Sequence, residues 1–225
     1  MKKKFSFIFC LLLGVSIFAE GSFLSDENWI GNYNIGLSIP IFSTSFESNS
    51  SVNSDAKGNG VNFYFNAQSI HKHTGFLFEA GLGAGGLKAK DFYNSDDEWG
   101  FNFLGQIGLG YAFMRNKKAL VTIAGVVGLD WSLFEKDVDM TIYGSTYKIT
   151  VETMPWVFFA GAELSGTIRL SEKVGIFGSC LFAVPFAGWE GVKVTYNGTS
   201  SSSSYDLNAG GYFIQPAFGL SITVD

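Results

Sequence analysis

The chain has 225 residues, a formal net charge of −5 and only 16% charged residues, with an equal share of aromatic residues. An acidic chain is a poor partner for nucleic acid, whose phosphates attract basic surfaces. Soluble domains carry about a quarter charged residues, so this composition indicates a protein that contacts lipid.

The first residues have the pattern of a secretory signal peptide, in which three lysines precede an apolar run from Phe5 to Phe18. The run is shorter than the ~20 residues of a spanning helix. We therefore expect residues 1–19 to be removed, with cleavage after Gly21 as the alternative. Cys180 is then the one cysteine of the mature chain, so an exported protein has no internal disulfide. Residues 20–225 are expected to form one domain.

Alternation of apolar and polar residues with a period of two continues through most of the mature chain and predicts an all-β protein. The predicted strands are Trp29–Phe42, Val61–Ile70, Phe76–Leu87, Phe101–Phe113, Ala119–Phe134, Trp156–Leu170, Val174–Trp189 and Leu207–Val224. Their lengths are those of tilted transmembrane β-strands.

One face of these strands is uniformly apolar, and the other is small or polar with few charges, namely Glu79, Asp130, Glu163 and Arg169. The second face is too poor in charge for a water-facing surface, but it suits the crowded interior of an eight-stranded barrel. Gly81, Gly83 and Gly85 lie on this interior face, where a missing side chain relieves crowding. The dinucleotide-binding pattern GxGxxG at Gly81, Gly83 and Gly86 does not indicate a nucleotide site, because no helix follows it.

The connections between the strands alternate in length. Three are short, at His71–Gly75, Met114–Lys118 and Ser171–Lys173, and four are long, at Ser43–Gly60, Lys88–Gly100, Glu135–Pro155 and Glu190–Asp206. Short periplasmic turns and long outer loops are typical of outer-membrane barrels. The serine-rich segment Asn197–Tyr205, which contains a glycosylation-type triplet, is interpreted as a flexible loop.

The last strand, AFGLSITVD, is similar to the assembly signal of outer-membrane proteins, with Gly219, Ile222 and Val224 at alternate spacing. With the strand pattern, it makes the mature chain resemble small eight-stranded outer-membrane barrels of the OmpX, OmpW and opacity-protein type. The resemblance implies a closed antiparallel up-and-down transmembrane β-barrel in the bacterial outer membrane.

Resemblance to barrel enzymes would require a histidine near the outer rim, but His71 and His73 both fall in a predicted periplasmic turn. Without that general base we expect no enzyme activity and no catalytic residue. The acidic run Asp96, Asp97 and Glu98 is interpreted as a solvated loop tip. We also expect no metal and no cofactor.

The upper lumen is predicted to be apolar, lined by Tyr64, Leu104, Phe134, Val157, Phe159 and Phe213. A turn at Gly144 and Ser145 would extend the third outer loop into a hairpin and add Val138, Met140, Ile142, Tyr147 and Ile149 at the mouth. Lower down, Glu79 and Arg169 are predicted to form an ion pair, because unpaired buried charges are costly.

Two functions follow from these expectations. A non-enzymatic barrel would bind or pass small apolar solutes through the upper lumen, as its resemblance to OmpW implies, and Pro185 and Pro216 would mark a weak seam as an exit. Alternatively, the long loops would act in adhesion, host interaction or structure above a plugged lumen. The expected partners are outer-membrane lipid and small hydrophobic solutes or host surface molecules.

Overall fold

The computed structural model of the protein describes residues 28–47, 53–90, 98–116, 118–142 and 145–224. At residues 45–47, 53–56, 90, 142, 205 and 207–209 the backbone alone is described. The predicted signal peptide lies outside the described residues. No helix in the described part of the chain is long and apolar enough to cross a membrane.

The described chain is built from antiparallel strands. They are β1 (Trp29–Ser38), β2 (Ile41–Glu47), β3 (Asn53–His71), β4 (Phe76–Lys90), β5 (Glu98–Arg115), β6 (Ala119–Ile142), β7 (Ser145–Arg169), β8 (Val174–Tyr196) and β9 (Thr199–Val224).

β1 and β2 form one spanning strand that is interrupted at Pro40. The backbone amide of Ile39 donates to the carbonyl of Pro216 on β9 at 2.9 Å, and the amide of Gly60 on β3 donates to the carbonyl of Pro40 at 3.0 Å. Proline has no amide hydrogen and leaves a break in the ladder, but both neighbouring strands stay bonded to this segment. The nine strands therefore correspond to the eight that the alternation predicts.

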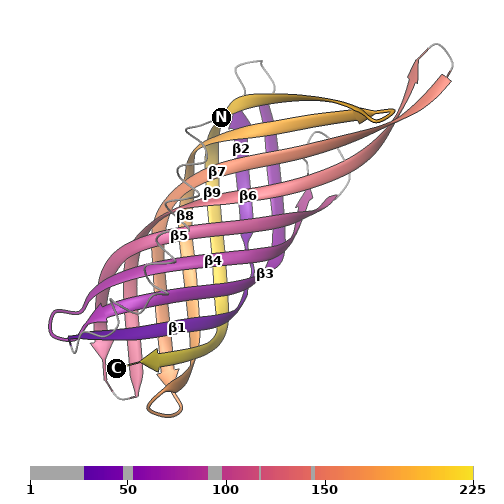
Figure 1. Cartoon of the computed structure of the whole chain (residues 1–225). Coiled ribbons are helices and arrows are strands. Elements are labelled where there is room, and N and C mark those ends of the chain that lie inside the picture. The colour runs from indigo at the N-terminus through magenta and orange to yellow at the C-terminus, as the bar shows by residue number, and fades with distance from the viewer. Residues whose placement is uncertain (1–27, 48–52, 91–97, 117, 143–144, 225) are drawn as a thin grey trace.

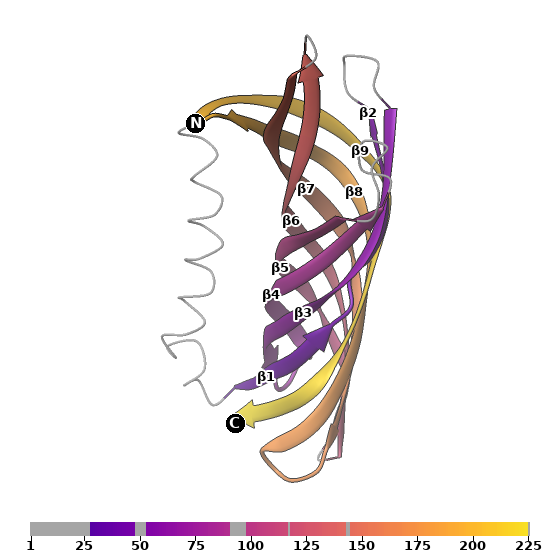
Figure 2. The ribbon, with the colours of Figure 1, turned by 90° about the vertical axis from the view of Figure 1, so that its right-hand side faces the viewer.

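The sheet closes on itself. Each strand from β3 to β8 pairs with the next, and β1 and β2 pair with both β3 and β9. Figure 1 shows the tilted strands of the resulting barrel, and Figure 2 shows the start of β1 beside the end of β9. The predicted all-β barrel with its first strand beside its last is confirmed.

The two faces of the wall differ as the sequence predicts. On β5, Phe101, Leu109 and Phe113 are about half exposed on the outside, whereas Asn102 and Gln106 are at most 1% exposed in the lumen. The outside of this strand is thus an apolar surface, which fits a hydrocarbon environment.

The long connections are more ordered than predicted. β8 and β9 continue as a hairpin from Gly188 paired with Leu207 up to Tyr196 paired with Thr199. Asn197 and Gly198 form its turn with positive φ angles of 46° and 77°, and this dipeptide is a strong signal for a two-residue hairpin turn. The flexible-loop interpretation of this segment is therefore wrong.

β6 and β7 also continue beyond the barrel as a hairpin, but with a different register from the predicted one. Ile142 pairs with Ser145 and Trp131 pairs with Trp156, so Ser145 belongs to β7 and the predicted turn at Gly144 and Ser145 is wrong. The shift moves each partner by two residues. Because the side-chain period of a strand is also two, the inward and outward faces stay as predicted.

Candidate functional site

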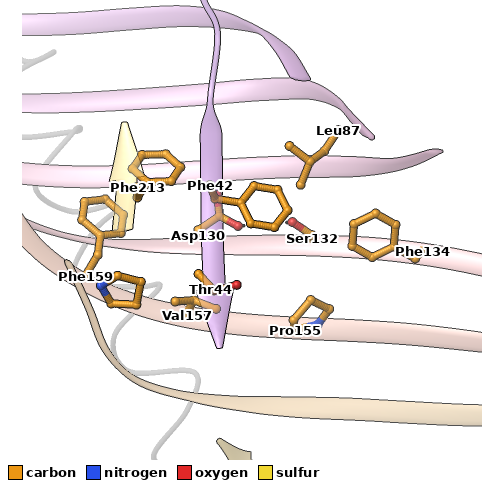
Figure 3. A pocket seen from close by; sticks show the side chains of 11 residues that line it. Phe42, Thr44, Leu87, Asp130, Ser132, Phe134, Pro155, Val157, Phe159 and Phe213 are labelled. Atoms are coloured by element: carbon orange, nitrogen blue, oxygen red, sulfur yellow. Dashed lines mark hydrogen bonds between the residues drawn. The ribbon is translucent and has the colours of Figure 1, made fainter. Parts of the chain in front are cut away.

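An apolar pocket opens in the upper lumen, between the β2 side of the barrel and the β6–β7 side (Figure 3). It encloses about 480 Å³ of empty space, including some open to solvent. Its lining is mostly aromatic and aliphatic and consists of Phe42, Thr44, Leu87, Asp130, Ser132, Phe134, Pro155, Val157, Phe159, Pro185 and Phe213. The apolar character of this lining suits a hydrocarbon group.

Polar groups gather on one wall of this pocket because β6 presents Asp130 and Ser132 two residues apart on the same face. The hydroxyl of Ser132 donates to Oδ1 of Asp130 at 3.2 Å. The amide of Asn102, on the neighbouring strand β5, donates to Oδ2 of Asp130 at 2.8 Å and to Oγ of Ser132 at 3.1 Å. Asn62 on β3 holds this amide by donating to its oxygen at 2.6 Å.

This cluster combines the parts that ester hydrolysis needs. Ser132 supplies a hydroxyl, Asp130 supplies an acceptor for its proton, and Asn102 supplies a donor beside the same oxygen. A nucleophile next to a base that is itself oriented by a third group is the geometric sign of covalent catalysis. The apolar pocket around the cluster would hold the acyl part of a substrate.

The histidines lie at the opposite end of the barrel, in the turn between β3 and β4. Nδ1 of His71 accepts the backbone amide of Thr74 at 3.2 Å and lies 3.0 Å from its hydroxyl. His73 is exposed in the same turn. Neither imidazole can act on a substrate in the pocket.

The described residues hold no group of three or more His, Cys, Asp or Glu side chains that could bind a metal ion. Of the acidic run, Asp96 and Asp97 lie outside the described residues. Glu98 forms a 3.0 Å ion pair with Lys136.

The structure brings together part of the predicted upper lumen. Phe134, Val157, Phe159 and Phe213 line the pocket, and the rings of Phe159 and Phe213 stack with their centroids 5.5 Å apart. Leu104 is fully buried in the same apolar core as Phe159.

Other predicted lumen residues lie elsewhere. Tyr64 lies deeper and donates to Glu163 at 3.2 Å. Val138 and Met140 are exposed on the β6–β7 hairpin, where Tyr147 and Ile149 are half-buried. These four do not line the pocket, and the side chain of Ile142 lies outside the described part.

The predicted ion pair between Glu79 and Arg169 is not among the ion pairs of the described residues. Glu79 instead accepts from Gln68 at 3.3 Å. The pairing of successive strands leads from Glu79 to Gly108, Val126 and Gly161, eight residues from Arg169. Barrel strands are tilted and staggered, so an equal distance from the strand end does not mean an equal height in the lumen.

Comparison with known proteins adds a chemical indication. Residues 13–124, just under half of the chain, match the family model of the lipid A 3-O-deacylases, PagL. The matched stretch includes Asn102 and ends before Asp130 and Ser132, so the roles of those two residues depend on geometry alone. No curated protein is significantly similar in sequence.

Among solved structures, the chain is similar to the outer-membrane protein OprG of Pseudomonas aeruginosa, with a TM-score of 0.53, 11% identity, and coverage of 87% of this chain and 95% of OprG. It also matches a major outer-membrane protein of Thermus thermophilus, with a TM-score of 0.48, 11% identity, and coverage of 84% and 99%. At such low identity the likeness to OprG shows the fold alone.

These findings confirm the outer-membrane barrel and correct the functional expectation. The chain is a small β-barrel protein of the bacterial outer membrane. The expectation of a non-enzymatic barrel that binds or passes small apolar solutes is contradicted by the match to a lipid A 3-O-deacylase family. The alternative, in which the long loops act in adhesion, host interaction or structure above a plugged lumen, is supported no better by this match.

Proposed function

We propose that this protein is an outer-membrane ester hydrolase that removes a fatty acyl chain from a lipid of the lipid A class. The proposal is carried by the hydroxyl of Ser132 and the carboxylate of Asp130, which line an apolar pocket, and by the buried amide of Asn102, which donates to both. The family match supplies the substrate class.

The reaction follows from the contacts of the cluster. Oγ of Ser132 attacks the acyl carbon of the ester, and its proton passes to Asp130, to which it is already hydrogen-bonded. As the acyl carbon's bond to the alcohol oxygen breaks, Asp130 returns the proton to that oxygen. Water then attacks the acyl-serine and gives a proton to Asp130. The bond between the acyl carbon and Oγ of Ser132 breaks, Asp130 returns the proton to Oγ, and the fatty acid leaves.

Asn102 has two roles in this scheme. Its amide donates to Asp130 and orients the carboxylate toward Ser132, and it also lies 3.1 Å from the oxygen that attacks. A fixed donor beside the nucleophile is close to the oxyanion that forms on the acyl carbon. Removing one donor of this kind costs about 10²–10³-fold in rate.

The test is release of fatty acid from lipid A in phospholipid vesicles, measured by mass spectrometry on purified, refolded protein. We expect Ser132→Ala to abolish acyl-serine formation and Asp130→Asn to slow hydrolysis by about 10²–10⁴-fold. Ser165→Ala is the matched control, because Ser165 is also a buried serine of the lumen face but lies outside the pocket.

Two results would reject the proposal. One is that the wild-type protein releases no more fatty acid than lipid A vesicles without protein. The other is a Ser132→Ala variant that folds and hydrolyses lipid A as fast as Ser165→Ala.

A further inference from the structure

The wall of the barrel has a break in its hydrogen-bond ladder between β8 and β9, beside the pocket. The two strands are paired up to Ala183 with Phe213 and again from Gly188 with Leu207, but not between these positions. Four residues of β8, 184–187, therefore have no partner on β9. At about 3.3 Å per residue the break is roughly 13 Å long.

The residues at the break account for it. Pro185 has no amide hydrogen to donate to a ladder. Phe186 is an extra residue on β8, because Pro185 and Ala187 pair with the adjacent residues Phe159 and Phe158 of β7. Such a bulge twists the strand away from its neighbour.

On the other side of the break, β9 turns toward β2. Gly211 has a φ of +107°, and a Cβ at this position would lie 2.0 Å from the carbonyl oxygen of Ser43. Residues 208–214 of β9 pair with β2 throughout. The backbone on each side of the break is therefore held by its other neighbour.

The break joins two apolar regions. Pro185 and Phe213 flank it and line the pocket inside. On the outside, Val184 and Phe186 are 58% and 60% exposed, on the face that meets lipid. An acyl chain that passes between β8 and β9 would thus meet apolar groups along its whole path.

The height of the break fits the outer leaflet. Its upper end, at Gly188, adjoins Trp189, whose ring stacks on that of Trp156 at 5.2 Å. Aromatic girdles of this kind lie at the level of the lipid headgroups. The break therefore begins where the acyl esters of a lipid begin, just below its headgroup.

We infer that the break between β8 and β9 is a lateral window through which an acyl chain of an outer-leaflet lipid enters the pocket and reaches Ser132. This inference rests on the proposed hydrolase function for its reaction, but the entry of the chain is measurable by itself. The lipid need not leave the membrane to be bound.

The test bridges the window covalently. Val184→Cys and Tyr212→Cys, in a Cys180→Ser background, are joined by a short bis-maleimide across the lipid face. The control joins Phe182→Cys to Ile214→Cys, two residues lower on each strand, where the ladder is intact. Both proteins are assayed with lipid A in vesicles and with p-nitrophenyl butyrate, a short ester that can enter from the open top.

We expect the bridged window to lower lipid A hydrolysis by at least about tenfold and to leave hydrolysis of the short ester unchanged, and the control bridge to change neither. Undiminished lipid A hydrolysis with the window fully bridged would overturn the inference.

A second readout does not depend on catalysis. A lipid with a diazirine at the end of its acyl chain is photolysed with the Ser132→Ala variant, and labelled peptides are identified by mass spectrometry. The window is supported if the peptides around Phe159 and Phe213 are labelled without the bridge and are not labelled with it. This result would support the window even if no lipid is hydrolysed and the hydrolase proposal is rejected. Absence of that labelling, or its persistence after bridging, rejects the window.

Discussion

The bond between Asn102 and Asp130 predicts a strong energetic coupling between these two residues. Asn102→Ala removes a 2.8 Å hydrogen bond to a carboxylate, worth about 1.5–3 kcal/mol. It also leaves the donor of Asn62, now bonded at 2.6 Å, without its acceptor, which costs about 1–3 kcal/mol more. We therefore expect Asn102→Ala to destabilise the barrel by roughly 2.5–6 kcal/mol.

In an Asp130→Ala background the same substitution should still cost the bonds to Asn62 and Ser132, but not the bond to Asp130, worth about 1.5–3 kcal/mol. The coupling energy is measured by a double-mutant cycle, using urea unfolding of the four proteins in phospholipid vesicles, followed by tryptophan fluorescence and gel mobility. A coupling energy below about 0.5 kcal/mol would mean that Asn102 does not hold Asp130, and the orienting role of this amide would be refuted.

Two further predictions concern β9 and the β6–β7 hairpin. Gly211→Ala should destabilise the barrel by at least about 1–3 kcal/mol, because alanine disfavours a φ of +107° and its Cβ would clash with the carbonyl of Ser43. A variant that unfolds at the same urea concentration as the wild type would contradict this prediction. Hydrogen bonds from Lys148 and then Thr150 hold the pKa of the exposed Asp137 carboxyl below its usual value, so the stabilisation they give the hairpin is present at neutral pH and is lost as pH falls through that pKa. Thr150→Val should raise the pKa of Asp137 toward its ordinary value in an NMR titration, and an unchanged pKa would exclude this bond.

Most of the barrel could be predicted because lipid and lumen impose opposite requirements on alternate residues. The alternation at residues 101–113 identifies a strand and both of its faces without any knowledge of its neighbours. The aromatic part of the pocket could also be predicted, since Phe134, Phe159 and Phe213 point inward by the same alternation.

The polar cluster could not be predicted from alternation alone. Asp130 and Ser132 are visible in the sequence as inward residues of one strand, but Asn102 becomes their partner only through the register between β5 and β6. That register depends on turn geometry and stagger. The prediction for Glu79 and Arg169 failed for the same reason, since heights in neighbouring strands follow the stagger of the barrel.

An outer rim without histidine does not exclude an ester hydrolase. A carboxylate next to a hydroxyl was present at Asp130 and Ser132, separated by one residue on one face, and this spacing was the available signal. The hairpin of β8 and β9 likewise has a clear signal in Asn197 and Gly198, although the serines that follow favour a flexible loop by composition.

The β8–β9 hairpin leaves an open edge above the closed barrel. From Thr199 to Asp206, β9 pairs with β8 on one side, and its pairing with β2 begins only at Asn208. The other side of this segment has no strand partner in the described part of the chain. An open edge invites pairing with another chain, and proteins protect such edges with polar residues and twist. The five consecutive serines at 200–204 offer hydroxyls and no apolar surface for a second copy to cover. Water therefore competes well with neighbouring proteins for the unpaired backbone groups of this edge.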